Sequence, residues 1–529
     1  MKKLLSILIV PALLTVPARL LLIFPLLLTA QSFATTISSP SNGSTVGTSV
    51  AFAATADRTS CAQGIASMGI YVDNALKFVV RGTNLSTSLT FGAGTYRSVV
   101  QAWDYCGGAA PSKAITFTVR PPDSSLYVST ERATQADAFV DSIGINTHLT
   151  YTDTLYYTQW STILSELQSS GIRHVRDGFY DWPSSSVFVT RHQALASAGI
   201  KTDYVVPLSG NTTSSVLQSF SSRVKDMEAI EAPNECDAGT NCGGGGTVGI
   251  NNVVAFLPTL TAAGSALNLP VLAPSFTLAS SYIAAGDLSS KVTYNNLHVY
   301  FGGRNPESTG WGDSDSSRNG YGSLAWWLDQ GNVDAANVTS MITESGYISY
   351  SKVNAPYTIP TSVEASYIPR TLLLAYNKGV KRTYMYEMID EVSSVGYGLL
   401  AADLSEKPAF TAVKNLIGVL TDAGSTFTAG SLSYSIAGAS SSLNHTLLQK
   451  RDGSFWLVLW SEQSSYNPAT NSTVAVIPQT INLICPGSVK PKQVITLNKT
   501  GALTSTRVSG RSNSIELSIS DQVTIVQID

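Results

Sequence analysis

The chain has 529 residues, of which 43% are hydrophobic and only 13% are charged. The 33 basic and 36 acidic residues give a formal net charge of -3, which argues against a protein that binds nucleic acid through a basic face. The apolar fraction excludes wholesale disorder, and the length indicates about two to four domains. The low charge, with abundant Ser, Thr, Gly, Asn and Tyr, favours an extracellular protein that meets neutral polar ligands.

The amino terminus has the features of an export signal. Two lysines precede a long apolar stretch that ends in Ser32-Phe33-Ala34, with small residues at both positions that a signal peptidase requires. A transmembrane anchor is the alternative, but three prolines and an arginine break the stretch into runs shorter than about 18 residues. We therefore expect a signal peptide over residues 1–34, bacterial export to the extracellular space, and no membrane span after cleavage.

The chain contains five cysteines, which an exported protein can oxidise. Cys61 and Cys106 fall within one predicted β domain and could pair, and Cys236 and Cys242 flank a short loop that they could staple. Cys485 is then the odd one, and we expect it to be buried. A zinc site is the alternative, but the spacings match no CxxC pattern, so we predict disulfides and no metal.

Two regions of the chain have the pattern of β domains. Residues 36–120 contain short apolar runs between Gly/Ser/Asn turns, a spacing typical of an immunoglobulin-like (Ig-like) sandwich. The opening SPSNGSTV stretch resembles that of Ig-like modules attached to bacterial secreted enzymes, and residues 121–125 are a plausible linker. Residues 425–529 predict a C-terminal β-sandwich, which could take one strand from the segment at 130–139.

Between these regions, over residues 130–420, strand-like runs alternate with helical ones or long loops. The alternation occurs eight times, which fits a (β/α)₈ barrel better than an open sheet. No GxGxxG motif follows the first strand, which argues against the doubly wound alternative. The predicted strands are SIGINTHL, RHVRDGF, KTDYVVPL, AIEAPNE, PVLAPSF, NNLHVYF, SMITESGY and RTYMYEMID.

In such a barrel, catalytic groups lie at the carboxyl ends of the strands. Glu235 ends the predicted fourth strand and Glu344 the seventh. Two carboxylates that face one cavity can cleave a glycosidic bond, one as the proton donor and the other as an ionised nucleophile. Arg176, which ends the second strand, would favour the charged form of Glu344. The other candidates to bind a substrate at strand ends are Asn146, His148, Asn234, His298, Tyr300 and Tyr386.

Three motifs resemble strand ends of the clan A retaining glycoside hydrolases, namely APNE at 232–235, LHVYF at 297–301 and MITESGY at 341–347. In that clan, an Asn-Glu pair after strand 4 supplies the acid/base and a glutamate after strand 7 is the nucleophile. The resemblance therefore implies that Glu235 is the acid/base and that Glu344 is the nucleophile.

Two further segments extend the resemblance along the barrel. VRDG at 175–178 is similar to the second-strand arginine segment of the clan, and the YGLL…KPA stretch at 397–416 is similar to the one that follows strand 8 in family 39-like members. Many members carry a tryptophan at the end of strand 8, where this sequence has YMYEMIDE. Stacking against the sugar would then come from Tyr386, or from Trp311 in the long polar loop after strand 6.

The resemblance implies a secreted retaining β-glycoside hydrolase that cleaves a β-linked polysaccharide or oligosaccharide by double displacement, without a cofactor. One alternative is a non-catalytic carbohydrate-binding or adhesion protein on the barrel scaffold, and another is a transglycosylase that uses the same two glutamates. The presence of both Glu235 and Glu344 argues against a binding-only protein. Three acids beyond strand 8 could bind sugar hydroxyls or form a solvated face. They are Glu387, Asp390 and Glu391.

Overall fold

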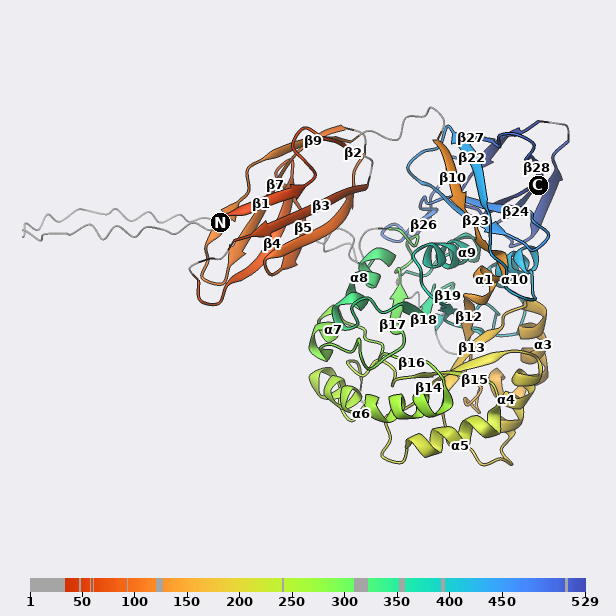
Figure 1. The fold of residues 1–529 in the computed structure, drawn as a ribbon. Helices are drawn as coiled ribbons and strands as arrows, with labels where there is room; N and C mark the ends of the chain where they lie inside the picture. The colour runs from red at the N-terminus through yellow and green to blue at the C-terminus, as the bar shows by residue number, and fades with distance from the viewer. Residues whose placement is uncertain are drawn as a thin grey trace, which may run out of the picture.

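The structure is a computed structural model, and it describes most of the chain after the predicted signal peptide. The described residues are 34–529 without 47–48, 58, 60, 93, 120–126, 240–241, 309–321, 352–356, 392–394 and 510–511. The predicted signal peptide up to residue 33, the predicted linker and Trp311 lie outside the described residues. What is described is a multidomain protein with one parallel barrel and several further β-sheets (Figure 1).

The amino-terminal β module predicted from the turn spacing is present as two sheets. One has the order β1-β3-β6, and the other has the order β2-β9-β7-β4-β5 with β8 beside β7. Buried side chains such as Phe52 and Phe117 form a core of their own. The strands are β1 (Thr35–Ser39), β2 (Thr45–Val46), β3 (Ser49–Ala56), β4 (Ile65–Val72), β5 (Ala75–Arg81), β6 (Asn84–Thr90), β7 (Gly94–Asp104), β8 (Ala109–Pro111) and β9 (Ile115–Val119).

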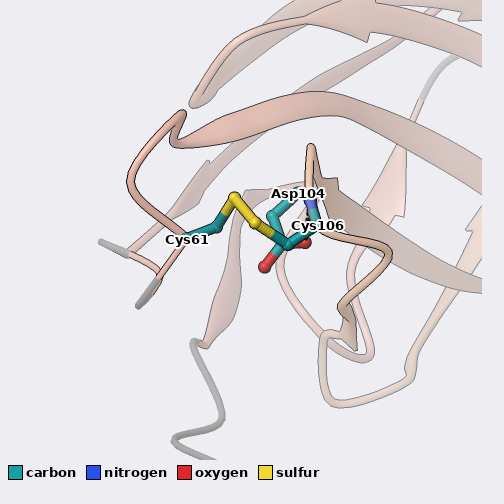
Figure 2. Close-up of side chains that lie close together, drawn as sticks. All are labelled: Cys61, Asp104 and Cys106. Atoms are coloured by element: carbon teal, nitrogen blue, oxygen red, sulfur yellow. Dashed lines mark hydrogen bonds between the residues drawn. A yellow bond between two sulfur atoms is a disulfide. The ribbon is translucent and has the colours of Figure 1, made fainter.

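A disulfide between Cys61 and Cys106 joins the β3–β4 connection to the turn after β7, as predicted (Figure 2). Asp104 organises this turn, because its carboxylate accepts hydrogen bonds from the Thr59 hydroxyl at 2.6 Å and from the amides of Cys106 and Gly108 at 3.0 and 2.7 Å. Both sulfurs and the carboxylate oxygens are therefore already in use. The group is a structural staple, although cysteine and aspartate are also metal ligands.

Eight parallel strands form the barrel, with the sheet order β16-β15-β14-β13-β12-β20-β18-β17. A parallel bridge between Leu272 and Tyr294 joins the two ends of this order and closes the ring. The strands correspond to the eight predicted ones, so the expected barrel is present. They are β12 (Ile143–Asn146), β13 (His174–Gly178), β14 (Lys201–Val205), β15 (Met227–Glu231), β16 (Val271–Leu272), β17 (Asn295–Tyr300), β18 (Ser340–Gly346) and β20 (Thr383–Met385).

Helices surround the barrel, and among them α9 (Thr361–Asn377) is buried on all sides over residues 363–375. The longest described helix, Gly246–Leu267, is apolar and long enough to cross a membrane, which the sequence reading did not anticipate. It packs between its neighbours α5 and α7 as part of the barrel (Figure 1). The helices are α1 (Ala136–Asp141), α2 (Leu155–Thr158), α3 (Trp160–Ser170), α4 (Val187–Ser197), α5 (Ser214–Val224), α6 (Gly246–Leu267), α7 (Ala279–Ala285), α8 (Leu324–Asp334), α9 (Thr361–Asn377) and α10 (Pro408–Leu420).

The carboxyl-terminal region forms two sheets, with the orders β10-β22-β27-β30 and β11-β23-β24-β31-β28-β29. The segment before the barrel supplies two strands, β10 and β11, one to each sheet, where one strand was predicted, so the chain enters the barrel from this sandwich (Figure 1). Cys485 is free and buried here, also as predicted. The strands are β10 (Tyr127–Arg132), β11 (Thr134–Gln135), β22 (Ser431–Ala437), β23 (Leu443–Gln449), β24 (Phe455–Ser461), β27 (Gln479–Ile484), β28 (Pro491–Leu497), β29 (Leu503–Arg507), β30 (Ser514–Ile519) and β31 (Thr524–Ile528).

A buried ion pair fixes the sandwich to the barrel. Arg370 of α9 donates to both carboxylate oxygens of Glu462, which follows β24. Asn305, in the loop after β17, donates to the same carboxylate at 2.8 Å. The sandwich thereby anchors the start of the loop that leaves strand 6 of the barrel. Two short strand pairs complete the described elements, namely β19 (Tyr350–Ser351) with β21 (Val395–Gly396) and β25 (Tyr466–Asn467) with β26 (Ser472–Thr473).

Candidate active site

Arg176 lies at the centre of a polar cluster at the carboxyl ends of the barrel strands. It forms a bidentate ion pair with Glu231 of β15, in which both N–O distances are 2.7 Å. Its terminal nitrogens also donate to Glu344 at 2.7 Å, to Asn146 at 2.9 Å and to Asn234 at 2.7 Å. Burial by itself lowers the pKa of Arg176, but Glu231 and Glu344 outweigh it and raise the pKa well above its usual value. The guanidinium is therefore a fixed cation.

Glu344, near the carboxyl end of β18, contacts three side chains. Arg176 donates to its Oε1 at 2.7 Å, the Tyr300 hydroxyl donates to its Oε2 at 2.8 Å, and His298 Nδ1 lies 3.5 Å from Oε2. Burial alone raises the pKa of Glu344. The electrostatic effects of His298 and Arg176, together with hydrogen bonds from Tyr300 and Arg176, outweigh burial and leave the pKa below its usual value. This carboxylate is held ionised.

A β-bulge aims Glu344 at the cluster. The register between β17 and β18 shifts after Leu297, so that His298 pairs with Glu344 and Thr343 is the extra residue. The Thr343 carbonyl accepts a hydrogen bond from the Asn146 side chain at 2.9 Å. An extra residue in one strand bends it and turns the following side chain, which is why bulges are common beside active sites.

Glu235 follows β15 in a left-handed backbone conformation, with φ at 44°. Non-glycine residues adopt this conformation only where the surroundings stabilise it. Here the Glu235 amide donates to the Ser275 hydroxyl at 3.2 Å. Its carboxylate Oε1 lies 2.7 Å from His298 Nδ1, and its side chain is 30% exposed. His298 therefore stands between the two glutamates and contacts both.

The loop after Glu235 is tightly held. The predicted disulfide between Cys236 and Cys242 is present. The first turn of α6 packs directly on this loop at Gly249, where a Cβ atom would lie 1.9 Å from the Cys236 carbonyl oxygen. Only glycine allows this approach. Disulfide and helix together hold the backbone on which Glu235 is carried.

A cavity of about 450 Å³ opens beside this cluster. Loops after β12, β13, β14 and β15 supply most of its wall. Glu235, His298 and Tyr300 lie behind this lining: His298 and Tyr300 contact Glu344, which lines the cavity, and Glu235 contacts His298. The predicted site residues that line the cavity are Asn146, His148, Arg176, Asn234, Glu344 and Tyr386. The structure thus brings together the predicted set except Trp311, which is not among the described residues.

His148 and Tyr386 form the side of the cavity next to β20. His148 packs edge-on against Tyr386, with ring centroids 5.6 Å apart, and its Nε2 lies 3.4 Å from the Glu387 carboxylate. Burial lowers the pKa of His148 to about 4 and raises that of Glu387 to about 9, the latter with help from Glu391 and Asp390. Both groups are therefore neutral near pH 7. This wall offers hydrogen bonds without net charge.

Sequence reasoning missed two residues that shape the site. Glu231 is fully buried beneath Arg176 and also accepts a hydrogen bond from Asn296 at 2.9 Å. Tyr397 packs against Tyr300 and Tyr386, with ring centroids 5.7 Å away in each case. A signal for Glu231 was available, because an acid four residues before Glu235 on a buried strand needs a cation. Tyr397 opens the YGLL…KPA stretch after strand 8, so the resemblance marked its segment, but nothing in that stretch showed that its ring reaches the site.

Two groups near the cavity have donor atoms suited to a metal ion. Glu235, His298 and Glu344 bring three such atoms within 4.8 Å of one another, as do His148, Glu387 and Glu391. In the first group, Arg176 and Tyr300 already occupy the oxygens of Glu344. In the second, His148 is already the neutral imidazole that metals bind, but burial keeps Glu387 protonated and it would first have to lose its proton. Neither donor set fits a metal without rearrangement.

No protein-family model matches the sequence, and no curated protein matches it. Solved structures similar to the chain include a Bacteroides uniformis β-glucuronidase 2, with a TM-score of 0.39 and 10% identity over 92% of this chain. This chain covers 61% of that protein's length. A Parabacteroides merdae β-glucuronidase has a TM-score of 0.35 and 8% identity, over 94% of this chain and 73% of its own. A glycoside hydrolase family 17 β-1,3-glucanosyltransferase from Rhizomucor miehei has a TM-score of 0.35 and 11% identity. The match covers 50% of this chain and 95% of that protein. At such low similarity, the function has to be argued from the site itself.

Proposed function

We propose that the protein is a retaining β-glycoside hydrolase that acts on O-glycosyl bonds. One observation carries the proposal: an oxygen of Glu235 and an oxygen of Glu344 lie within 4.8 Å of each other beside a cavity. Carboxyl groups about 5–5.5 Å apart are typical of retaining glycosidases, whereas inverting enzymes need about 6.5–9.5 Å to admit a water molecule. An approach of one oxygen pair to within 4.8 Å agrees with the shorter of these separations and supports double displacement.

Glu344 would be the nucleophile, because Arg176 and Tyr300 hold its carboxylate ionised. Its oxygen attacks the anomeric carbon and forms an ester with the sugar, while Glu235 donates a proton to the departing glycosidic oxygen. Glu235 then removes a proton from water, which attacks the same carbon and releases Glu344. The anomeric configuration is inverted twice and so retained.

Asn234 would bind the sugar beside the reacting carbon. Its carbonyl oxygen accepts from Arg176 at 2.7 Å, which directs the amide NH₂ group away from the arginine. That NH₂ group is a donor suited to the sugar 2-hydroxyl, a contact that strengthens in the transition state. His298 would keep Glu235 oriented, because its Nδ1 lies 2.7 Å from the carboxylate.

We also propose that the enzyme is exported and that residues 36–120, 130–420 and 425–529 are its mature domains, with an Ig-like module first. The two disulfides support an oxidising compartment. Membership of a family 39-like group within clan A belongs to the same proposal and rests on the strand-end motifs. The substrate would be a β-linked polysaccharide or oligosaccharide.

The test measures reducing-sugar release from a panel of β-linked glycans and aryl β-glycosides by the wild type, Glu344→Gln and Glu235→Gln. Wild-type release that both variants lose by about 10³-fold or more supports the proposal. Azide then assigns the roles, because Glu235→Ala would give a β-glycosyl azide and Glu344→Ala an α-glycosyl azide. Product analysis separates hydrolysis from transfer to a second sugar. A glycan that all three proteins bind equally, without cleavage, would contradict the proposal and indicate a binding protein.

A further inference from the structure

Two tyrosines of the cavity wall are unusually exposed for large aromatic side chains. Tyr151, in the loop after β12, is 43% exposed, and Tyr180, in the loop after β13, is 52% exposed. Both line the cavity that contains Glu344. Exposed aromatic surface that lines a cavity marks a ligand contact more often than a surface tyrosine elsewhere does.

Asp177 of β13 fastens the loop that carries Tyr151 to the strand from which the loop with Tyr180 leaves. Its Oδ2 accepts from the Thr147 hydroxyl at 2.6 Å and from the Leu149 amide at 3.1 Å, both in the first loop. Its Oδ1 accepts from the amide of Gly178, the last residue of β13, at 2.7 Å. Asp177 is 2% exposed, so these bonds are shielded from water. A buried carboxylate thus holds the first loop against the start of the second.

Each tyrosine ring also rests on another ring. Tyr180 stacks on Trp182, with centroids 5.9 Å apart and planes 28° apart, and Trp182 in turn stacks on Phe188 of α4 at 4.9 Å. Tyr151 stacks on His148, with centroids 4.5 Å apart and planes 14° apart. A ring that is already ordered loses little conformational entropy when a ligand packs on its outer face.

The charged groups that line the cavity near the two tyrosines are engaged with partners. The Asp177 oxygens accept three hydrogen bonds, and Arg176 is engaged by Glu231 and Glu344. His148 is neutral near pH 7 because burial lowers its pKa to about 4. Away from Glu344, the part of the wall that the two tyrosines form therefore presents ring faces beside engaged polar groups. This surface suits the apolar face and the hydroxyls of a neutral sugar ring.

We propose that Tyr151 and Tyr180 form a stacking subsite for a second neutral sugar unit, next to the unit that reacts at Glu344. The substrate is then a β-linked oligosaccharide or polysaccharide that runs past the reacting unit toward the loops after β12 and β13. The inference rests on the proposed hydrolase function and adds to it a minimum substrate length and the wall along which the chain lies.

The test compares kcat/KM for an aryl β-monoglycoside with kcat/KM for β-linked oligosaccharides of two to six units of the same sugar. In the wild type, kcat/KM should rise from one unit to two or three. Tyr180→Ala and Tyr151→Ala should each lose about 5- to 10-fold on the longer substrates and less than about 2-fold on the monoglycoside. Tyr180→Trp should retain the gain, because it keeps a flat apolar face.

Tyr105→Ala is the matched control, since Tyr105 is 60% exposed but lies in the amino-terminal module. It should change none of these values. Equal losses on the monoglycoside and on the longer substrates, or a wild type without length dependence, would overturn the subsite while leaving the hydrolase proposal intact.

If no glycan on the panel is cleaved, calorimetric binding of the same oligosaccharides decides the subsite separately. Weaker binding of two or more units to Tyr180→Ala than to the wild type would support it. Equal binding to both proteins, or none to either, would overturn it.

Discussion

The two ends of the barrel carry the same kinds of side chain in different settings. At the carboxyl ends of the strands, Arg176 and His298 contact Glu344. At the amino ends, His174 Nδ1 lies 2.7 Å from the Glu228 carboxylate, and Arg382 donates to the same carboxylate at 3.1 Å. Each end therefore has a histidine, an arginine and a buried acid in direct contact.

The pKa values do not tell the two ends apart. Burial alone raises the pKa of Glu228, but His174 and Arg382 outweigh it and leave the pKa lowered, just as their counterparts do for Glu344. Both ends also have a second acid, because Asp141 at the amino ends lies 3.0 Å from His174 and 3.4 Å from Arg382 and is 41% exposed. At the carboxyl ends, Glu235 comes within 4.8 Å of Glu344, and Glu344 lines a cavity. A perturbed carboxylate thus marks a charge network, and a pair of carboxylates beside a cavity marks the candidate for catalysis.

The largest expected effect on activity comes from a pair of single variants, each of which removes one acid from one end of the barrel. Glu344→Gln should lower kcat by about 10³-fold or more with little loss of stability, since it removes the nucleophile. Glu228→Gln should keep kcat within a few-fold but lower the stability, because His174 and Arg382 lose one carboxylate partner and keep only Asp141. Activity assays and thermal unfolding of both variants check the pair. Equal effects on activity would contradict the division between the two ends.

The next effect comes from the two arginines. Arg176→Lys should lower kcat/KM by about 10²-fold or more, because a lysine cannot form a bidentate ion pair with Glu231 and also donate to Glu344. Arg382→Lys should lower the melting temperature without a comparable loss of kcat/KM. Steady-state kinetics beside calorimetry measures both. A loss of activity in Arg382→Lys that matches Arg176→Lys would show that the ends are coupled.

The acid side of the pH profile should report Glu344. Since its pKa in the folded state lies below the ordinary 4.5, kcat/KM should fall only as the pH falls below 4.5. The stability that this depressed pKa contributes is present above the unfolded pKa and is lost as the pH falls through the folded value. Tyr300→Phe removes a hydrogen bond that lowers the pKa, so it should move the acid limb upward. If the acid limb of the kcat/KM profile stays in place in Tyr300→Phe, Tyr300 does not lower the pKa of Glu344.

The smallest effect concerns Glu364, in the first turn of α9. Burial raises its pKa to about 8, although Lys407 acts in the opposite direction. The contribution of Glu364 to stability therefore changes with pH in the opposite direction to that of Glu344. The free energy of unfolding should decrease as the pH rises from about 4.5 to 8. Glu364→Gln should raise the melting temperature at pH 9 by about 2–4 °C relative to the wild type, and less at pH 5. Calorimetry at both pH values measures this difference.

Local pattern predicted the elements and the candidate pair. The alternation of strand-like and helical runs predicted all eight barrel strands. The apolar periodicities of strands and helices, about 2 and 3.6 residues, depend only on residues close together in the sequence. Glu235 and Glu344 were identified because the carboxyl ends of parallel strands meet at one face of a barrel. The separation of six residues between Cys236 and Cys242 likewise indicated a staple without knowledge of the fold.

Contacts across the barrel could not be predicted in this way. The extra residue Thr343, which pairs His298 with Glu344, depends on the register between two strands. Glu231 is engaged by Arg176 because both point into the same interior layer.

By itself, then, the sequence determined the order of the barrel strands and which residues near their carboxyl ends are candidates for chemistry. Only the tertiary structure decided where each strand ends, which oxygens face each other and which rings line the cavity. Tyr151 shows the physical reason, because its loop is joined by hydrogen bonds to Asp177 of β13 rather than by any local pattern. Strand register, loop conformation and burial are set by contacts between residues far apart in the chain.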